Sequence, residues 1–430
     1  MKRRTTAPAV PIWNHIDLQY NIAMQNRKVT YRLYPNASQQ KKMLNMLGVH
    51  QRLYNRALEQ RIQYYKENQK SLSFANQCKS LTVWRKEDEQ LNAINAQSQQ
   101  VTLKRLALAF QAFFRRLKSG DKPGFPRFKS FHRYPGWGYK THGDGFRVFV
   151  TDDKAHGRIR LSDIGLISMR GNPRNRGEVK TCEILHKAGK WYASITIECE
   201  PKRTHGKNAI GFDWGVETFV TGVDNTQVTI KIDNPRFLRN ELPKLKKSQQ
   251  DVSRKTNKKS HNRKKCIVKL SKLHAKIANQ RKEFSHQKSA EIVKRYALIA
   301  TEQLSVKPMT ASGGAYKKGL NREILSTAPS KFLSLVKTKA EEAGAWFVEI
   351  PTRKVKPSQT CHGCGAQKKK SLSERYHVCE CGVRCSRDEN AARVILNWAL
   401  DWASGQKLAE LGSRGSFAML NQKTPTIPFC

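Results

Sequence analysis

The pattern of apolar and polar residues changes from a strand-like to a helical period near residue 36. In KVTYRLYP (28–35) apolar residues alternate with polar ones, as in a half-buried β-strand. After Asn36 the apolar residues recur at intervals of three, four and seven, and Asn36 with Gln39 has the spacing of a helix-capping box. The chain is therefore predicted to pass from a strand into a long amphipathic helix at Asn36.

A second helical pattern covers QVTLKRLALAFQAFFRRLKSG (100–120), which Gly120 is expected to end. One face of this helix is apolar and the other carries its bases. We interpret the apolar face as core packing rather than as a surface on which nucleobases stack. Its residues are Leu103, Leu106, Phe110, Phe113, Phe114 and Leu117.

Residues 145–200 contain four strand-like runs, GFRVFVT, GRIRLS, EVKTCEIL and KWYASITIECE. Each run alternates apolar and polar residues, which is typical of strands with one buried face. We expect a β-rich, barrel-like module, which the strand at 28–35 joins.

The pattern after residue 206 alternates strands with helices. NAIGFDWGVETFVTGVDN (208–225) and YALIATEQLSV (296–306) read as buried strands, and residues 328–350 read as a helix that ends at Gly344 before another strand. Strands that alternate with helices predict an α/β core.

The net charge of the chain indicates what kind of partner it binds. The 430 residues include 80 Lys or Arg and 34 Asp or Glu, which gives a formal charge of +46. Such an excess is tolerated mainly beside a polyanion, so nucleic acid is the expected partner, bound with strong salt dependence. Residues 239–283 are the most basic stretch, and Lys258, Lys259 and Arg263 are candidate contacts to phosphate.

An anionic membrane surface is the competing partner. No apolar stretch approaches the roughly 18 residues of a spanning helix, and the basic N-terminus lacks the apolar region of a secretory signal. We expect a cytoplasmic, nucleoid-associated protein that contacts no membrane.

Three acids stand out because each lies at the end of a predicted core element. Asp213 lies in a strand, Glu302 closes another strand, and Asp388 opens a helix in RDENAARVIL. Clustered carboxylates stay ionised together when divalent cations neutralise them. The pattern indicates a two-metal site, in which a pair of Mg²⁺ or Mn²⁺ ions promotes phosphodiester hydrolysis.

Five of the ten cysteines are crowded between residues 361 and 385. A Cys-x-x-Cys pair followed by a Cys-x-Cys pair is typical of a zinc ribbon. Since the second pair is one residue short, Cys385 or His377 could replace one ligand. The four cysteines of the two pairs are the favoured ligands: Cys361, Cys364, Cys379 and Cys381.

Several segments together resemble the TnpB family of transposon-encoded, RNA-guided DNA endonucleases, which are related to type V CRISPR effectors. GFDWGVETFVTGVDN, IATEQLSV and RDENAA resemble the three motifs of the RuvC-like nuclease, and TCHGCG to VCECG resembles its zinc ribbon. YRLYPNASQ, LYNRAL, GFPRFKS, HAKIANQRKEFSHQKSAEIV and VKPSQTCHGCG extend the resemblance over nearly the whole chain.

The resemblance implies a multidomain α+β fold: an RNase H-like (RuvC) α/β core with an inserted zinc ribbon, a β-barrel wedge domain and a helical recognition domain. It also implies that Asp213, Glu302 and Asp388 are catalytic and bind magnesium, and that the partners are a guide RNA and a double-stranded DNA target. The implied divisions are an extension (1–27), the wedge domain (28–36 and 121–205), the recognition domain (37–120), the nuclease domain (206–357 and 386–404), the ribbon (358–385) and a flexible tail (405–430).

The resemblance further implies that the protein reads a short DNA motif beside the target. Phe74, Gln97 and Gln100 in the helical segment are candidates for this contact, and Arg127 is a candidate contact to nucleic acid. Trp214 departs from the family pattern, which usually has a small or aliphatic residue there. Two other functions stay open: a guided DNA-binding regulator with weak or no nuclease activity, and a strand-transferring transposase.

Overall fold

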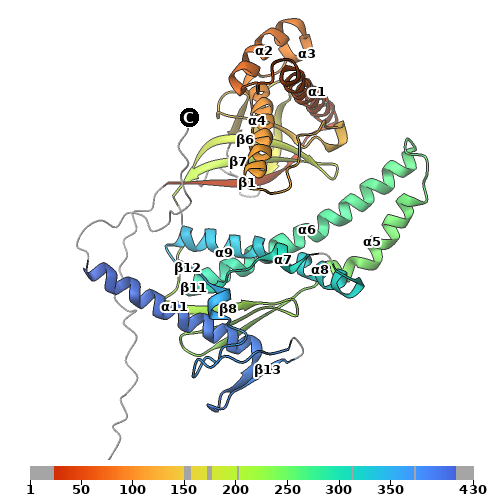
Figure 1. Cartoon of the computed structure of the whole chain (residues 1–430). Coiled ribbons are helices and arrows are strands. Elements are labelled where there is room, and N and C mark those ends of the chain that lie inside the picture. The colour runs from red at the N-terminus through yellow and green to blue at the C-terminus, as the bar shows by residue number, and fades with distance from the viewer. Residues whose placement is uncertain are drawn as a thin grey trace, which may run out of the picture. The chain divides into compact units, whose positions relative to one another are not determined.

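The computed structural model describes residues 24–412, apart from 150–155, 172–176, 201–202, 312 and 372–373, and for residues 406–412 it describes the backbone alone. The described chain divides into two compact units, with the boundary near residue 201. Figure 1 shows both units, which we describe separately.

The first unit contains a seven-stranded antiparallel sheet that is nearly closed and barrel-like. Its strand order is β2-β6-β7-β1-β5-β4-β3. The strands are β1 (Gln25–Tyr34), β2 (Gly136–Tyr139), β3 (Phe146–Phe149), β4 (His156–Leu161), β5 (Gly165–Arg170), β6 (Glu178–Lys187) and β7 (Lys190–Cys199).

The first strand joins this sheet although more than 100 residues separate it from the others. β1 pairs along its length with β7, from Gln25 opposite Cys199 to Leu33 opposite Trp191, and its end pairs with β5. The alternation of residues in 28–35 therefore predicted the strand correctly, and the expectation that it joins the β-rich module is confirmed.

The helices of the first unit share one hydrophobic core with the sheet. The predicted capping box is present, since the Gln39 backbone N–H donates to Asn36 Oδ1 at 2.8 Å and the Asn36 N–H donates to Gln39 Oε1 at 3.0 Å. The helices are α1 (Ala37–Asn68), α2 (Phe74–Glu87), α3 (Glu89–Asn92), α4 (Ala96–Lys118) and a 3₁₀ turn (Phe131–Arg133).

The core-packing interpretation of the apolar face at 100–120 is wrong for its second half. The buried residues of α4 all lie between Ser98 and Phe110, where the helix packs against α1, α2 and β2. Beyond Phe110, Phe114 is 43% exposed and Leu117 is 56% exposed. Helical periodicity identified the apolar face, but the core ends two turns before the helix does.

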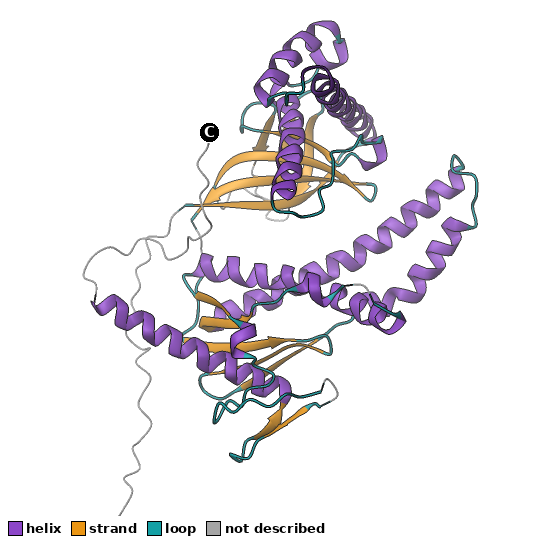
Figure 2. Ribbon diagram, in the orientation of Figure 1, coloured by secondary structure: helices purple, strands orange, loops and turns teal. Residues whose placement is uncertain are grey.

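The second unit is built on a five-stranded sheet of order β10-β9-β8-β11-β12, which Figure 2 shows between helices. β9 runs antiparallel to both of its neighbours, β8 and β10, whereas β8, β11 and β12 run parallel. The strands are β8 (Asn208–Trp214), β9 (Thr218–Asp224), β10 (Thr229–Asp233), β11 (Tyr296–Glu302) and β12 (Trp346–Ile350).

The helices of this unit include a long hairpin, in which α5 and α6 lie side by side (Figure 1). A short two-stranded hairpin, β13 and β14, precedes the last helix. The elements are α5 (Phe237–Ser253), α6 (His261–Arg295), α7 (Val306–Met309), α8 (Ala315–Thr327), α9 (Pro329–Ala343), α10 (Thr352–Val355), β13 (Tyr376–Val378), β14 (Arg384–Ser386) and α11 (Arg387–Gly412).

The first strand and the last helix both extend past the predicted domain boundaries. β1 begins at Gln25, inside the expected extension, and α11 continues to Gly412, past the residue at which the tail was expected to begin. The rest of both terminal segments lies outside the described residues. None of the described helices carries an apolar stretch long enough to cross a bilayer.

The two faces of the five-stranded sheet pack against different helices. Ile210 and Phe212 point into a core with α6 and α9, while Ala209 and Ala300 point into a core with α11. Because side chains of a strand alternate between faces, Gly211 and Asp213 lie on the α11 face, as does Glu302 in β11.

Gly211 lets α11 pass very close to β8. A Cβ atom at this position would lie 2.4 Å from the Leu396 backbone nitrogen and 2.5 Å from the Ala392 carbonyl oxygen. Both are backbone atoms of a buried helix, so no side chain can move aside. Glycine is therefore required here for packing.

Replacing Gly211 by Ala is expected to lower the free energy of unfolding by about 1–3 kcal/mol, because overpacking forces the helix away from the sheet. Denaturant unfolding measures the loss. Gly319→Ala in α8 is the matched control: its Cβ would meet open space, so this change should stabilise the helix by about 0.5–1 kcal/mol. Equal stability of Gly211→Ala and the unmodified chain would contradict the close approach.

Candidate active site and cysteine cluster

Asp213 and Glu302 lie at neighbouring positions on adjacent parallel strands. Thr301 of β11 pairs with Phe212 of β8, so the next residue of each strand lies beside the other. Both acids point to the face that α11 covers. The carboxyl ends of parallel strands thus bring together two residues that are 89 positions apart in the sequence.

Asp388 comes to Asp213 and Glu302 from α11, the helix that covers this face of the sheet. It is the second residue of α11, which packs across β8, β9 and β11. Its charge acts on the Asp213 carboxyl, together with that of Glu302. Three acids predicted from separate segments therefore meet at one edge of the sheet.

The electrostatics of this cluster disfavour ionised Asp213. Burial, followed by the charges of Glu302 and Asp388, holds the pKa of Asp213 well above its ordinary value, against the lowering effects of the Trp214 backbone N–H and Arg387. Burial also raises the pKa of Glu302, which Arg387 opposes. Protein groups alone therefore compensate the three carboxylates only in part.

Arg387 is a residue that the sequence interpretation missed. It precedes Asp388 directly, and its guanidinium lowers the pKa of both Asp213 and Glu302. Its Nη1 also donates to the Ser371 carbonyl oxygen at 2.7 Å. The sequence RDENAA shows that Arg387 precedes Asp388. It does not show that the charge of Arg387 acts on the acids of β8 and β11.

The donor set of the acid cluster fits a hard divalent cation. Such ions prefer carboxylate oxygens, and a positive ion would offset both the burial and the repulsion that raise the pKa of Asp213. Asp213, Glu302 and Asp388 are the residues that would hold it.

Trp214 lies on the opposite face from the acids. Its side chain is buried in the core with α6 and α9. The departure from the family pattern at this position therefore lies in the packing behind β8, on the opposite face from the acids.

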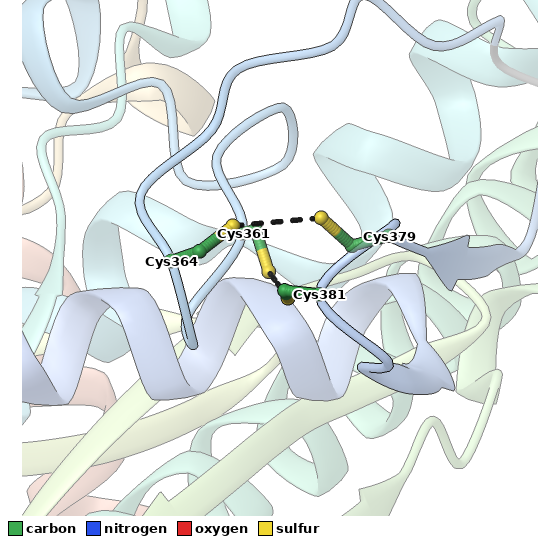
Figure 3. A group of neighbouring side chains, drawn as sticks. All are labelled: Cys361, Cys364, Cys379 and Cys381. Carbon is green, nitrogen blue, oxygen red and sulfur yellow. Dashed lines mark hydrogen bonds between the residues drawn. The ribbon is translucent and has the colours of Figure 1, made fainter.

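The four cysteines of the two predicted pairs form a cluster, shown in Figure 3. Their sulfur atoms all lie within 4.8 Å of one another, with Cys361 3.7 Å from Cys381 and Cys364 3.5 Å from Cys379. These separations are too long for disulfides, whose sulfur atoms lie about 2.05 Å apart. They match the roughly 3.8 Å between ligands of a tetrahedral ion with Zn–S bonds of about 2.3 Å.

The protonation of the cluster also fits a cation. Burial raises the pKa of Cys361, but the backbone N–H groups of Cys364 and Gly363 and the side chain of His377 lower it to about 5. The Val383 N–H favours the thiolate of Cys381, yet Cys364 and Cys379 raise the pKa of Cys381 to about 12. Without a metal the cluster ionises only in part, whereas a Cys₄ zinc site needs thiolates.

The two alternative ligands lie next to the cluster but outside it. His377 pairs with Cys385 across the β13–β14 hairpin, and neither belongs to the group of sulfur atoms within 4.8 Å. His377 is buried, and its side chain lowers the pKa of Cys361. The geometry therefore supports the two cysteine pairs as the metal ligands.

Asn390 ties the cysteine cluster to the helix that carries Asp388. Its Oδ1 accepts from the His362 backbone N–H at 3.1 Å and faces His362 Nδ1 at 3.0 Å, and its Nδ2 donates to the Thr360 carbonyl at 2.6 Å. Asn390 is completely buried. Its contacts hold the first cysteine pair against α11.

Replacing Asn390 by Ala is expected to destabilise this attachment by about 1–3 kcal/mol, because it leaves buried donors and acceptors without partners. Hydrogen exchange of the Thr360 to Cys364 segment and of the first turn of α11 should rise together. Asn397→Ala is the matched control: Asn397 makes one 3.2 Å bond to the His362 carbonyl at an exposed position, so exchange should change little. Unchanged exchange in Asn390→Ala would show that the attachment does not depend on this amide.

The candidate DNA-motif readers lie on neighbouring helices of the first unit. Phe74 begins α2 and packs partly into the core, with Lys104 of α4 over its ring at 5.2 Å. Gln100 accepts from Lys140 Nζ at 2.9 Å, and Gln97 has a buried Oε1 without a described partner. Their role in reading DNA stays a prediction.

The other candidate contacts to nucleic acid lie around the start of α6 and in the loop between α4 and β2. Lys258 and Lys259 are exposed just before α6, whereas Arg263 uses its Nε to bind the Lys255 carbonyl at 2.9 Å. Arg127 is exposed in the segment between α4 and β2. These contacts also remain predictions.

Comparison with known protein families gives three matches along the chain. Residues 192–313 match the family OrfB_IS605, described as "Probable transposase", and residues 330–395 match "Cas12f1-like, TNB domain". Residues 24–70 match the helix-turn-helix domain of the OrfB_IS605 family.

Two relatives cover most of the chain. The chain is 29% identical over 381 residues to a protein of Streptomyces pristinaespiralis named "Putative RNA-guided DNA endonuclease", covering 86% of this chain and 88% of the relative. It is also 29% identical over 384 residues to a protein of Escherichia coli (strain K12) with the same name and the suffix InsQ, covering 85% and 90%.

Among solved structures, a Cas12f1 chain in a complex with sgRNA and target DNA resembles most of this chain. The TM-score is 0.56 at 13% identity, and the match covers 87% of this chain and 99% of the other. The molecule therefore has a Cas12-like multidomain fold with helices, a nearly closed barrel-like sheet and a four-cysteine cluster. The chain is thus similar to TnpB-type transposon proteins: it matches two OrfB_IS605 family models and, over most of its length, two relatives named as RNA-guided DNA endonucleases.

Proposed function

We propose that this protein is an RNA-guided DNA endonuclease that depends on a divalent metal. The observation that carries the proposal is the meeting of Asp213, Glu302 and Asp388 on one face of the five-stranded sheet, where burial and then the charges of the other two acids raise the pKa of Asp213. The two relatives that cover most of the chain carry the name of this activity.

The three carboxylates would hold Mg²⁺ or Mn²⁺, and the bound ions would supply electrostatic stabilisation for attack on a phosphodiester. In that reaction a water oxygen forms a bond to phosphorus while the bond from phosphorus to one sugar oxygen breaks. The water loses its two protons to solvent, and the departing sugar oxygen takes one proton from solvent to become a hydroxyl. Asp213 would lie at the centre of the site, because both other carboxylates act on it. The rigid strands β8 and β11 would fix two carboxylates, and the first turn of α11 would fix the third.

The domain division follows from the same proposal. The sheet and helices after residue 206 would form a RuvC-like nuclease domain (206–357 and 386–404), with a zinc ribbon (358–385) that Cys361, Cys364, Cys379 and Cys381 hold. The barrel-like sheet would be the wedge domain (28–36 and 121–205) and the helices the recognition domain (37–120). The shared core of sheet and helices in the first unit supports a rigid junction between these two.

The partners would be a guide RNA and a double-stranded DNA target. A chain of charge +46 needs a resident polyanion, and a bound RNA would neutralise most of that charge. Base pairing would read the target sequence, while the protein would read a short flanking motif.

The second candidate function is strand transfer, which the family description "Probable transposase" favours. Both functions would use the same acids, but their products differ. A nuclease leaves broken ends, whereas a transposase joins a free 3′ end to a second DNA.

The experiment that tests the proposal begins with the protein purified together with its cellular RNA. Sequencing this RNA defines the guide segment, and a plasmid library with the matching target and random flanks then reports cleavage in Mg²⁺. We expect cuts only in plasmids that carry the target beside one short motif. Joined products would favour the transposase, target retention without cuts would favour a DNA-binding regulator, and a preparation without RNA at moderate salt would contradict the guided mechanism.

A further inference from the structure

The segment after the buried part of α4 is unusually rich in phenylalanine and in bases. Residues 113–133 contain five Phe, seven Lys or Arg and a single acid, Asp121. A surface segment of this composition exposes apolar rings inside a strongly positive field, which a protein seldom does without a function.

Three of these rings form a contiguous cluster at the end of α4. The centroid of Phe113 lies 5.2 Å from that of Phe114 and 5.4 Å from that of Phe125, both in edge-on geometry. Phe114 is 43% exposed and Phe125 is 49% exposed. We call Phe113, Phe114 and Phe125 the aromatic platform.

The aromatic platform rests on a fixed support. The ring centroid of Phe110 lies 5.6 Å from that of Phe125. The Arg61 guanidinium carbon lies 5.0 Å from the Phe110 ring centroid, in a cation–π contact. Gly120, at a φ of 68°, reverses the chain after α4. The returning segment is pinned to α1, because Lys129 N–H donates to Asn55 Oδ1 at 2.9 Å and Asn55 Nδ2 donates to the Lys129 carbonyl at 3.0 Å.

Exposed positive residues flank the platform residues in the sequence. Arg115, Arg116, Lys118 and Lys122 are exposed beside its rings in the sequence, and Asp121 is the one acid among these four bases. A second copy of this chain would bring the same positive charges to the contact and would be repelled. The charge therefore favours a polyanion that also has flat apolar faces.

We infer that the aromatic platform binds unpaired nucleotides of RNA, with bases stacked on Phe114 and Phe125 and phosphates beside the flanking bases. Double-stranded nucleic acid hides its base faces, so only unpaired nucleotides can use exposed rings. The choice of RNA over DNA rests on the proposed function, because a resident guide RNA would cover the rings permanently while target DNA is transient.

The test measures binding of a 15-nucleotide fluorescent oligouridine to the full chain after copurifying RNA is removed at high salt. Phe114→Leu keeps an apolar side chain but removes the ring, and it should weaken binding about five- to one-hundredfold. The salt dependence should stay unchanged, because no phosphate contact is lost. Phe114→Trp should restore affinity, and Arg116→Gln should instead reduce the salt slope by about one.

Tyr316→Leu is the matched control, since Tyr316 is an aromatic residue that is 89% exposed in the lysine-containing α8. Its affinity should stay within about twofold of the unmodified chain. The inference is overturned if Phe114→Leu binds as the unmodified chain does, or if Phe114→Trp is as weak as Phe114→Leu.

Ultraviolet crosslinking of the RNA-containing complex, with target DNA added, tests the choice of RNA. We expect a ribonucleotide on a peptide that contains Phe114 or Phe125, and a deoxynucleotide there instead would overturn the assignment to RNA. The results of these tests distinguish a failure of the aromatic platform from a failure of the proposed endonuclease function. A chain that cuts no guided target but loses oligouridine binding in Phe114→Leu would refute the endonuclease and retain the platform, and the reverse result would refute only the platform.

Discussion

Replacing Asp213 by Asn is expected to reduce guided DNA cleavage about a thousandfold or more, which corresponds to about 4 kcal/mol in the activation barrier. The asparagine side chain would keep the shape of the carboxylate but would supply a neutral ligand at the centre of the acid cluster. Single-turnover cleavage of a labelled target in Mg²⁺ measures the rate. Binding of guide RNA and target DNA should be unchanged, because the substitution lies on the acid-bearing face of the sheet.

The stability of the same variant serves as its control. The pKa of Asp213 in the folded chain lies above its ordinary value, so its ionised form lowers the stability of the fold as the pH rises above about 4. Asp213→Asn removes this penalty. In magnesium-free buffer at pH 7 the variant should melt about 2–4 °C higher than the unmodified chain, and the difference should vanish as the pH falls to about 4.

Two results would contradict this account of Asp213. Cleavage at the unmodified rate would exclude the carboxylate from the chemistry. A lower melting temperature at pH 7 would show that the side chain supports the fold and that a loss of cleavage could follow from unfolding.

Replacing Cys364 by Ser is expected to remove zinc from the second unit almost completely. A serine hydroxyl does not ionise near neutral pH, so the site would keep only three good ligands, and the binding free energy of a structural zinc site, about 10–16 kcal/mol, would be largely lost. Metal analysis of the dialysed protein measures the zinc content. Cleavage should fall at least about tenfold, because Asn390 connects the first cysteine pair to the helix of Asp388.

Cys385→Ser is the matched control for Cys364. Cys385 lies in β14, opposite His377 and outside the cluster of four sulfur atoms, so its loss should leave the zinc content unchanged. Zinc that is retained in Cys364→Ser and lost in Cys385→Ser would reverse the ligand assignment.

Much of the fold follows from local patterns. The helix cap at Asn36, the strand that delivers Glu302 and the helix end at Gly344 all depend on residues within a few positions of each other, and the structure has each of them where the pattern predicts. Sequence spacing likewise indicated the two cysteine pairs, because a metal site of this kind draws each pair from one tight turn.

Contacts between segments that are distant in the sequence were harder to predict from the sequence. The apolar face of α4 continues to Leu117, and periodicity cannot show where the core that covers it stops. The contact of Gly211 with Leu396 joins residues 185 positions apart, and a glycine in a strand can equally mark a bulge or a bend. Asn390 was visible in RDENAA, but its partners lie in the loop that precedes the first cysteine pair and in that pair itself.

The sequence by itself determined the class of chemistry: an excess of positive charge, three acids at the ends of core elements, and two cysteine pairs. These features depend on residue type and on short-range order, which a sequence displays directly. Only the tertiary structure decided which face of the sheet carries the acids, how closely α11 approaches it, how Asn390 joins the cysteine cluster to Asp388, and which phenylalanines of α4 stay exposed. Each of these depends on contacts between distant segments, and the free energy of such contacts is set by how the whole core packs.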